Sequence, residues 1–467
     1  MLFNSWLYIA FLVVVVLVYW FFLSNKKYYR NIFLLLISYF FYGCWDWRFL
    51  GLIFLSSLID YFVSLKIFEN AGNKKVWLIL SLACNLGLLF VFKYFNFFIE
   101  SWVDLMNSVG FQTDYYSLSL ILPVGISFYT FQTLSYTIDV YRGVLKPVKS
   151  SVAFFAYVSF FPQLVAGPIE RACNLLPQFE KIKSFNPVPF ASGVKLIIWG
   201  LFKKMVIADY CAIYVNHIFS NYTQASSSEL LLGAVFFGFQ IYGDFSGYTD
   251  IAIGSARLLG FDLMKNFRTP YFATTLADFW RRWHISLTTW FRDYLYIPLG
   301  GSRGGLKKTI RNVWIIFLVS GFWHGANWTF IIWGGIHALF FMPYLLKWNE
   351  NSFFKKFPAI LGTLFTFAIV SLAWVFFRAP SVSVAYDYLK GIFVNENSGI
   401  FDQILWVPSL LIILFLILEK TIKDSEVPSI FKFESVVFRR VFIVVTIGCI
   451  LFFSLITTQN EFIYFQF

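Results

Sequence analysis

The sequence predicts an all-α protein that crosses a membrane many times. Three observations support this fold class: the composition, the apolar runs and the charges of the loops between them. Of the 467 residues, 59% are hydrophobic and only 13% are charged, whereas soluble domains carry about 25% charged residues. One crossing takes about 20 apolar residues. We therefore expect a polytopic single domain over 1–467 with about 11–12 transmembrane helices.

The remaining composition excludes several classes of protein. The net charge of +12 would suggest a nucleic-acid partner in a soluble protein. Here the basic residues lie in short loops between apolar runs, where the positive-inside rule explains them, so no nucleic acid is expected. The five cysteines lack CxxC spacing and sit in or beside apolar segments, which predicts no disulfide or metal framework. The first run has neither a basic stretch before it nor a small-residue cleavage site after it, so we expect an uncleaved span.

Twelve apolar runs are candidate spans, with edges uncertain by several residues. They are 6–23, 31–45, 50–66, 76–98, 118–138, 190–215, 230–256, 312–330, 331–346, 358–377, 404–418 and 441–457. No linker, low-complexity stretch or repeat with a period of 20–50 residues interrupts them.

Basic residues gather in alternate loops, which predicts the orientation. Lysines and arginines follow the first and fifth spans and precede the fourth, whereas 101–116 and 217–229 contain none. We therefore expect the basic loops in the cytosol and both ends of the chain outside.

Two stretches do not fit a simple crossing. In 152–169, Pro162, Gly167 and Pro168 would break a helix at membrane depth, which is tolerated only beside protein or a water-filled cavity. Basic residues flank it on both sides, so we expect a segment that enters and leaves from the cytosol. The stretch 270–300 mixes charges with tryptophan and phenylalanine, and we expect short helices that dip into a cytosolic vestibule.

Histidines are the main candidates for chemistry, because the sequence has only four. His324 lies twelve residues into its predicted span, about 18 Å from the cytosolic edge and near the middle of a core about 30 Å thick. An ionisable group at that depth usually faces a cavity or a polar partner. Its simpler role would be a hydrogen bond that locks two helices. His284, which ends the run 279–284, is either a second catalytic or positioning group or a packing residue.

The other candidates are weaker. His217 fits a solvated residue at the end of a span. His337 follows His324 by 13 residues without an acidic residue between them, which is not the spacing of a zinc pair, so no metal is expected. The loop 300–305 is either a helix breaker or, with Arg303, a contact for a phosphate-bearing donor.

Four stretches and one short element carry a resemblance to a known family. They are 123–128 running on to 139–143, 160–169, 244–250, the run from 270 to 305, and 323–325 together with His337. With them the chain resembles the membrane-bound O-acyltransferases. The resemblance is specific over about 120–345, which we take as the core of the domain.

The resemblance implies that His324 is the catalytic histidine and that His284 is its partner across a central tunnel open to both sides. It further implies an O-acetyltransferase in the bacterial cytoplasmic (inner) membrane that takes acetyl from cytosolic acetyl-CoA, a substrate rather than a bound prosthetic group. Arg281, Arg282 and Arg303 are candidates to attract this anionic donor, although the positive-inside rule also explains them.

The expected partners are membrane lipid, a periplasmic or extracellular acetyltransferase, and an acceptor such as an alginate-like polysaccharide, cellulose or peptidoglycan. Three alternatives stay open: a D-alanyl exporter of the same family, a transporter or flippase, and a non-catalytic scaffold.

Overall fold

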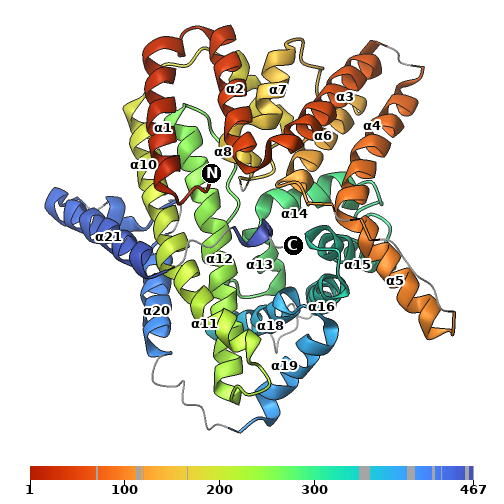
Figure 1. Ribbon diagram of the computed structural model, residues 1–467, viewed down its shortest axis with the longest axis vertical. Helices are drawn as coiled ribbons and strands as arrows, with labels where there is room; N and C mark the ends of the chain where they lie inside the picture. Colours follow the sequence, from red (N-terminus) through yellow and green to blue (C-terminus); the bar gives the residue numbers. More distant parts are fainter. Residues whose placement is uncertain are drawn as a thin grey trace. The chain divides into compact units, whose positions relative to one another are not determined.

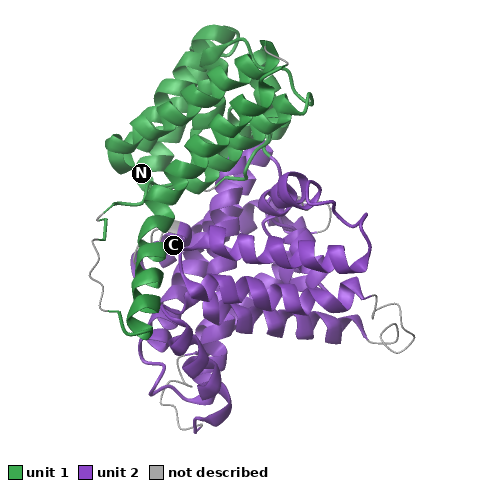
Figure 2. Ribbon diagram, turned by 90° about the vertical axis from the view of Figure 1, so that its right-hand side faces the viewer, with its two compact units in different colours: residues 1–190, 255–263 green, residues 191–254, 264–467 purple. Residues whose placement is uncertain are grey.

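The computed structural model describes residues 1–69, 72–111, 117–118, 120–165, 167–346, 358–396, 405–422, 426–432, 434–457 and 462–465. These residues form helices and no strands (Figure 1). They divide into two compact units, one of residues 1–190 and 255–263 and one of residues 191–254 and 264–467 (Figure 2).

Long apolar helices dominate the chain. Seven helical stretches of the described residues are long and apolar enough to cross a membrane: Trp6–Leu23, Lys27–Glu69, Lys74–Ser108, Ser227–Leu258, Trp328–Leu345, Ala359–Arg378 and Val436–Ile456. The all-α, multi-pass membrane fold is thus confirmed. The finer count of about 11–12 crossings stays a prediction, and Ser119 and Ile404 of the predicted spans lie outside the described residues.

Among the described residues, nine α-helices lie wholly within the first unit. They are α1 (Trp6–Val18), α2 (Lys27–Asp46), α3 (Leu50–Glu69), α4 (Lys74–Leu89), α5 (Phe95–Ser108), α6 (Ile126–Tyr141), α7 (Ser151–Ser159), α8 (Phe161–Leu164) and α9 (Ala172–Glu180).

A buried acidic group ties three of these helices together. Asp60 on α3 accepts hydrogen bonds from Asn85 on α4 (2.9 Å), from Thr137 on α6 (3.1 Å) and from Ser81. A buried charge is tolerated when its oxygens are hydrogen-bonded in this way. Polar side chains therefore fix the packing of otherwise apolar helices.

The predicted break in 152–169 is present. Helix α7 ends at Ser159, Phe160 adopts φ −49° and ψ 108°, and α8 begins at Phe161 with Pro162 in its first turn. Ala166 lies outside the described residues. The segment is therefore not one continuous helix, while its entry from the cytosolic side stays a prediction.

The second unit holds the region of the expected chemistry. Its elements are α10 (Pro187–Leu201, from 191 onwards), η4 (Phe202–Ala208), α11 (Asp209–Ser220), α12 (Ser227–Leu258, up to 254), η5 (Pro270–Phe272), α13 (Leu276–Arg282), α14 (Ile285–Phe291), η6 (Arg292–Tyr296), α15 (Leu306–His324), α16 (Trp328–Leu345), α18 (Ala359–Arg378), α19 (Val382–Val394), α20 (Trp406–Lys420), η9 (Ser429–Lys432), α21 (Val436–Ile456) and η10 (Ile463–Phe465). The stretch 270–300 is built from η5, α13, α14 and η6, so it contains short helices as predicted.

A tight hairpin of α15 and α16 places His324. The predicted boundary between 330 and 331 is wrong, because α15 already ends at His324 and Asn327 caps α16 by accepting from the Thr329 N–H (3.0 Å). The two backbones approach closely: a Cβ at Gly334 would lie 2.2 Å from the Phe317 carbonyl oxygen. Small residues allow such approach between membrane helices. His324 therefore sits at a helix end beside a turn, not in the middle of a helix.

Candidate active site

His284 lies between two short helices in a strained backbone conformation. It is the residue before α14 and has φ 43° and ψ 54°, in the left-handed region that non-glycine residues rarely adopt. Such a conformation costs about 1–3 kcal/mol and persists only where surrounding contacts hold it. Here Asn266 supplies the contacts: its Oδ1 lies 3.0 Å from His284 Nδ1 and accepts from the Ser286 N–H (3.2 Å) and the Ser286 hydroxyl (2.9 Å).

These contacts fix the tautomer of His284. A backbone N–H can only donate, so the Asn266 atom facing Ser286 is the amide oxygen. The same oxygen faces His284 Nδ1, so Nδ1 carries the proton and Nε2 carries the lone pair. Burial lowers the pKa of His284 to about 3 because it disfavours the charged ring. His284 is therefore a neutral imidazole whose Nε2 can accept a hydrogen bond from a ligand.

His324 faces His284 inside an aromatic cluster. The two imidazole centroids are 6.4 Å apart, and both side chains are almost fully buried. The rings of Trp323, Trp333 and Phe377 surround His324 at centroid distances of 4.9, 5.2 and 5.4 Å. The structure thus brings together the two histidines that the resemblance implied, although 40 residues separate them in the sequence.

A further wall of the cluster comes from η10, which the sequence did not single out. The Tyr464 ring lies 5.6 Å from the His324 ring and 4.5 Å from Phe245, and Phe245 contacts His284 edge-on at 4.7 Å. These contacts place η10 against α12 and α15, and Figure 1 shows it away from the helix α21 that precedes it in the sequence. The aromatic run Phe462–Phe465 was the only available signal, and nothing in its spacing predicts a contact with a histidine.

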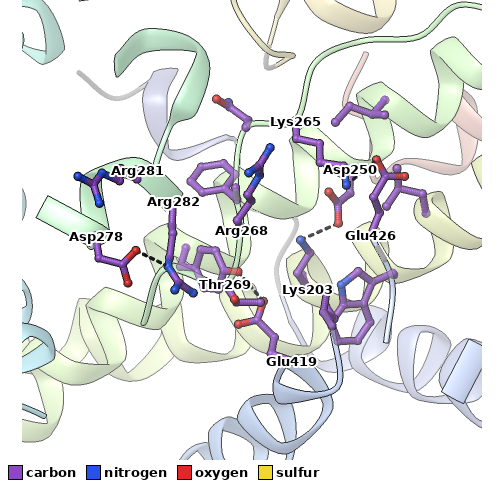
Figure 3. A pocket seen from close by; sticks show the side chains of 17 residues that line it. Lys203, Asp250, Lys265, Arg268, Thr269, Asp278, Arg281, Arg282, Glu419 and Glu426 are labelled. Carbon is purple, nitrogen blue, oxygen red and sulfur yellow. Dashed lines mark hydrogen bonds and ion pairs between the residues drawn. The ribbon is translucent and has the colours of Figure 1, made fainter. Parts of the chain in front are cut away.

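A cavity of about 720 Å³ opens in the same unit (Figure 3). Its polar lining residues are Lys203, Asp250, Lys265, Asn266, Arg268, Thr269, Asp278, Arg281, Arg282, Glu419 and Glu426, with Tyr242, Trp199, Phe267 and aliphatic side chains between them. Asn266 belongs both to this lining and to the support of His284. The cavity therefore borders His284 through the Asn266 side chain.

The five basic residues of the cavity are not equally available. Lys203 pairs with Asp250 (2.7 Å), Lys265 with Glu426 (3.4 Å) and Arg282 with Asp278 (3.0 Å). Arg281 donates to the Tyr344 hydroxyl (2.8 Å). In the part of the chain that the structure describes, the Arg268 guanidinium makes no ion pair. Arg268 is thus the cation most accessible to an anionic ligand.

The expected donor-binding arginines separate into two groups. Arg281 and Arg282 line the cavity, as the sequence suggested. Arg303 is exposed on the loop between η6 and α15 and is not in the lining. No spacing in the sequence distinguishes Arg268 from the many other basic residues.

The cavity also contains a buried acidic group that the sequence reasoning missed. Glu419 at the end of α20 is 1% exposed and accepts a hydrogen bond from Tyr242 on α12. The Tyr242 ring packs against the rings of Phe267 and Trp283. Tyr242 and Glu419 add apolar and acidic surface to the lining, so the cavity is not uniformly positive.

The remaining histidines lie elsewhere. His337 accepts a hydrogen bond from Trp280 Nε1 (3.3 Å) and packs against Trp333, which fits a role in helix packing. His217 is exposed in the last turn of α11. Neither contacts both members of the pair formed by His284 and His324.

Comparison with known proteins gives a consistent result. The sequence model of the membrane-bound O-acyltransferase family matches residues 145–379. The chain is 39% identical to a Pseudomonas aeruginosa protein named probable alginate O-acetylase, over 76% of this chain and 68% of that protein. It is 39% identical to the peptidoglycan O-acetyltransferase of Helicobacter pylori, over 76% of this chain and 72% of that protein.

A more distant similarity extends to another acyl group. The teichoic acid D-alanyltransferase of Bacillus subtilis is 29% identical over 56% of this chain and 69% of that protein. The family match covers both histidines of the pair and the cavity residues from Lys203 to Arg282. On these grounds, this multi-pass membrane protein belongs to the membrane-bound O-acyltransferase family and is an O-acyltransferase.

Proposed function

We propose that this protein moves an acetyl group from cytosolic acetyl-CoA across the bacterial cytoplasmic membrane for O-acetylation of an envelope or secreted polysaccharide. The observation that carries the proposal is the pair His284–His324, buried at 6.4 Å beside a cavity with several cationic groups. The names of the relatives favour acetyl over D-alanyl, because alginate and peptidoglycan O-acetyltransferases match at 39% identity and the D-alanyltransferase at 29%.

The chemistry needs a base for the acceptor hydroxyl. His324 takes the hydroxyl proton as a general base while the oxygen attacks the thioester carbonyl. The carbon–sulfur bond then breaks, and the leaving thiolate receives that proton from the imidazolium. The products are an acetyl ester and a free thiol, and the imidazole is neutral again.

His284 has a narrower role than the sequence suggested. Because its Nδ1 proton is engaged with Asn266, Nε2 accepts a hydrogen bond and does not donate one to the thioester carbonyl. A hydroxyl carries one proton, so the reacting hydroxyl donates to His324 and a neighbouring hydroxyl of the same acceptor donates to His284 Nε2, each over about 2.8 Å. In this arrangement His284 orients the acceptor molecule while His324 deprotonates its reacting hydroxyl.

The cavity is the proposed place of the coenzyme. Arg268, Arg281 and Arg282 face the phosphates, because guanidinium groups bind phosphate oxygens in a bidentate manner. The acetyl end then reaches the histidines past Asn266. The proposal requires the cavity to open to the cytosol, with the amino terminus outside, and the acceptor to enter from the opposite side.

The acceptor oxygen belongs to a glycan or to a secreted acetyltransferase that passes the group on. Alginate, cellulose and peptidoglycan all present suitable hydroxyls. A transporter or flippase would not need a histidine pair with a fixed tautomer, and for this reason acyl transfer is the better account.

The decisive experiment is His324→Ala in the full chain. Purified protein in proteoliposomes receives labelled acetyl-CoA and an acceptor glycan, and acetyl transfer is expected to fall by at least about 10³-fold because the general base is lost. The matched control is His217→Ala. It removes an exposed histidine in the last turn of α11, outside the histidine pair, and is expected to leave the rate unchanged. Equal rates for the two variants, at equal amounts of folded protein in the membrane, would remove the mechanism.

A second measurement identifies the acyl group. Mass spectrometry of envelope glycans from a deletion strain is expected to show loss of acetyl esters. Loss of alanyl esters with normal acetylation would assign the protein to the D-alanyl branch instead.

A further inference from the structure

The η10 segment is attached to α12 by one backbone hydrogen bond. The Ile463 N–H donates to Asp244 Oδ2 at 2.7 Å, and both residues are buried. Hydrogen bonds to an ionised carboxylate are about twice as strong as those between neutral groups. No side chain of η10 is charged, so this bond is its ionic anchor.

Asp244 is itself held by a buried lysine. Lys204 Nζ lies 2.6 Å from Asp244 Oδ1 and 2.7 Å from Asp209 Oδ1, and all three side chains are at most 4% exposed. One ammonium between two carboxylates leaves one formal negative charge. The second oxygen of Asp244 faces η10 and accepts the hydrogen bond from the Ile463 N–H. A buried carboxylate needs such a hydrogen bond to offset the loss of water.

Phe462 and η10, which follows it directly, form part of the histidine site. Phe462 packs on Tyr248 (4.8 Å) and Phe245 (5.5 Å), while Tyr464 packs on Phe245 and His324. Phe245 in turn contacts His284. Displacement of η10 would therefore remove a wall from His324 and loosen the ring that supports His284.

We propose that Asp244 is a positioning residue of the active site, which acts through η10. Lys204 orients the Asp244 carboxylate, the carboxylate seats the Ile463 backbone, and the seated segment holds Tyr464 against His324. Asp244 touches no reacting atom in this scheme. The competing account is that Asp244 only neutralises Lys204, in which case Asp209 has the same importance.

The first test measures whether η10 stays seated. The full chain carries Ile463→Cys, which keeps the backbone N–H, and its five native cysteines are replaced. Asp244→Asn is expected to raise the rate of maleimide labelling at position 463 by about 10- to 100-fold, the equilibrium shift of one hydrogen bond to a charged group. Asp209→Asn is the matched control: it removes the other partner of Lys204 but leaves the contact with η10, so the rate stays within about twofold.

The second test removes the other half of the bond. Ile463→Pro deletes the donor N–H at the first position of a helical turn, where proline is tolerated, and leaves the ionic cluster intact. Asp244→Asn and Ile463→Pro are each expected to lower kcat by at least about 10-fold with little change in KM for acetyl-CoA. The double variant is expected to lose clearly less than the product of the two single losses, since both variants act on the contact between Asp244 and the Ile463 N–H. Ile463→Val, which keeps the N–H, serves as the control for the side chain.

The outcomes separate the two accounts. Unchanged labelling in Asp244→Asn, equal labelling in Asp209→Asn, or multiplied losses in the double variant would each overturn the positioning role. The kcat readout rests on the proposed function, whereas the labelling readout does not. Labelling that follows the expectation in a protein that transfers no acetyl group would support the inference and reject the proposed function.

Discussion

The support of His284 leads to a specific prediction for Asn266→Ala. The Asn266 amide oxygen faces three buried donors: His284 Nδ1, the Ser286 N–H and the Ser286 hydroxyl. Alanine leaves all three without this acceptor. The left-handed backbone of His284 and the proton on its Nδ1 then lose the contacts that hold them.

The magnitude follows from these contacts. One buried donor without an acceptor costs about 1–3 kcal/mol, so three would cost at most about 3–9 kcal/mol. Asn266 also lines the cavity, so water can reach the site and reduce the loss of stability to roughly 2–4 kcal/mol. For the rate, a catalytic histidine in the wrong tautomer loses up to about 10⁴-fold. We expect kcat to fall by about 10²- to 10⁴-fold.

The assay is acetyl transfer by purified protein in proteoliposomes, with the melting temperature measured on the same samples. Asn266→Asp keeps the acceptor oxygen and is expected to retain activity at high pH. Its new carboxylate raises the pKa of His284, so its activity falls at a higher pH than that of the parent. Ser286→Ala removes one donor and keeps the bond from Asn266 to His284, so its rate should drop by less than about tenfold. A rate for Asn266→Ala within a few fold of the parent would refute the role of the tautomer.

Three further predictions concern the cavity, the hairpin and pH. Arg268→Gln should raise KM for acetyl-CoA by about 3- to 10-fold without lowering kcat, whereas Arg303→Gln, outside the cavity, should change neither kinetic constant. Gly334→Ala should lower thermal stability by at least about 1–3 kcal/mol because its Cβ meets the Phe317 carbonyl, whereas Gly335→Ala, with no atom closer than 3.9 Å, should be neutral in the same melting experiment. Because burial lowers the pKa of His284 to about 3, this residue binds an extra proton in the unfolded chain once the pH falls below about 6.5, and its contribution to stability should decrease there by at most about 1.4 kcal/mol per pH unit. Melting curves between pH 7.5 and 5 should show this decrease, and His284→Asn should make it shallower.

Composition and periodicity predicted the class of fold because a lipid-facing surface requires apolar residues over whole helices. The break near Pro162 was predictable for the same reason, since proline excludes a continuous helix. The end of α15 was not, because Gly325 can continue a helix as well as end it. Its termination depends on the capping by Asn327 and on the packing of α16.

The two histidines were identified from the sequence because ionisable groups in apolar runs are costly and few. Their distance was not predictable from residues alone, since it depends on how α13 to α15 fold back on each other. Tyr464 was missed, and Asp244 appeared only as part of the stretch 244–250 with no role assigned to it. An aromatic run after a membrane span usually fits an interface with lipid headgroups, and an aspartate in an apolar helix does not indicate which distant backbone it binds.

Helix α12 has a consequence for inhibition. Tyr242, which lines the cavity, and Phe245, which contacts His284, are one turn apart, a rise of about 4.5 Å on a single rigid helix. A small molecule that wedges the cavity open against Tyr242 would shift Phe245 with it. Such a compound would impair catalysis without overlapping the acceptor, and acceptor excess would not restore turnover.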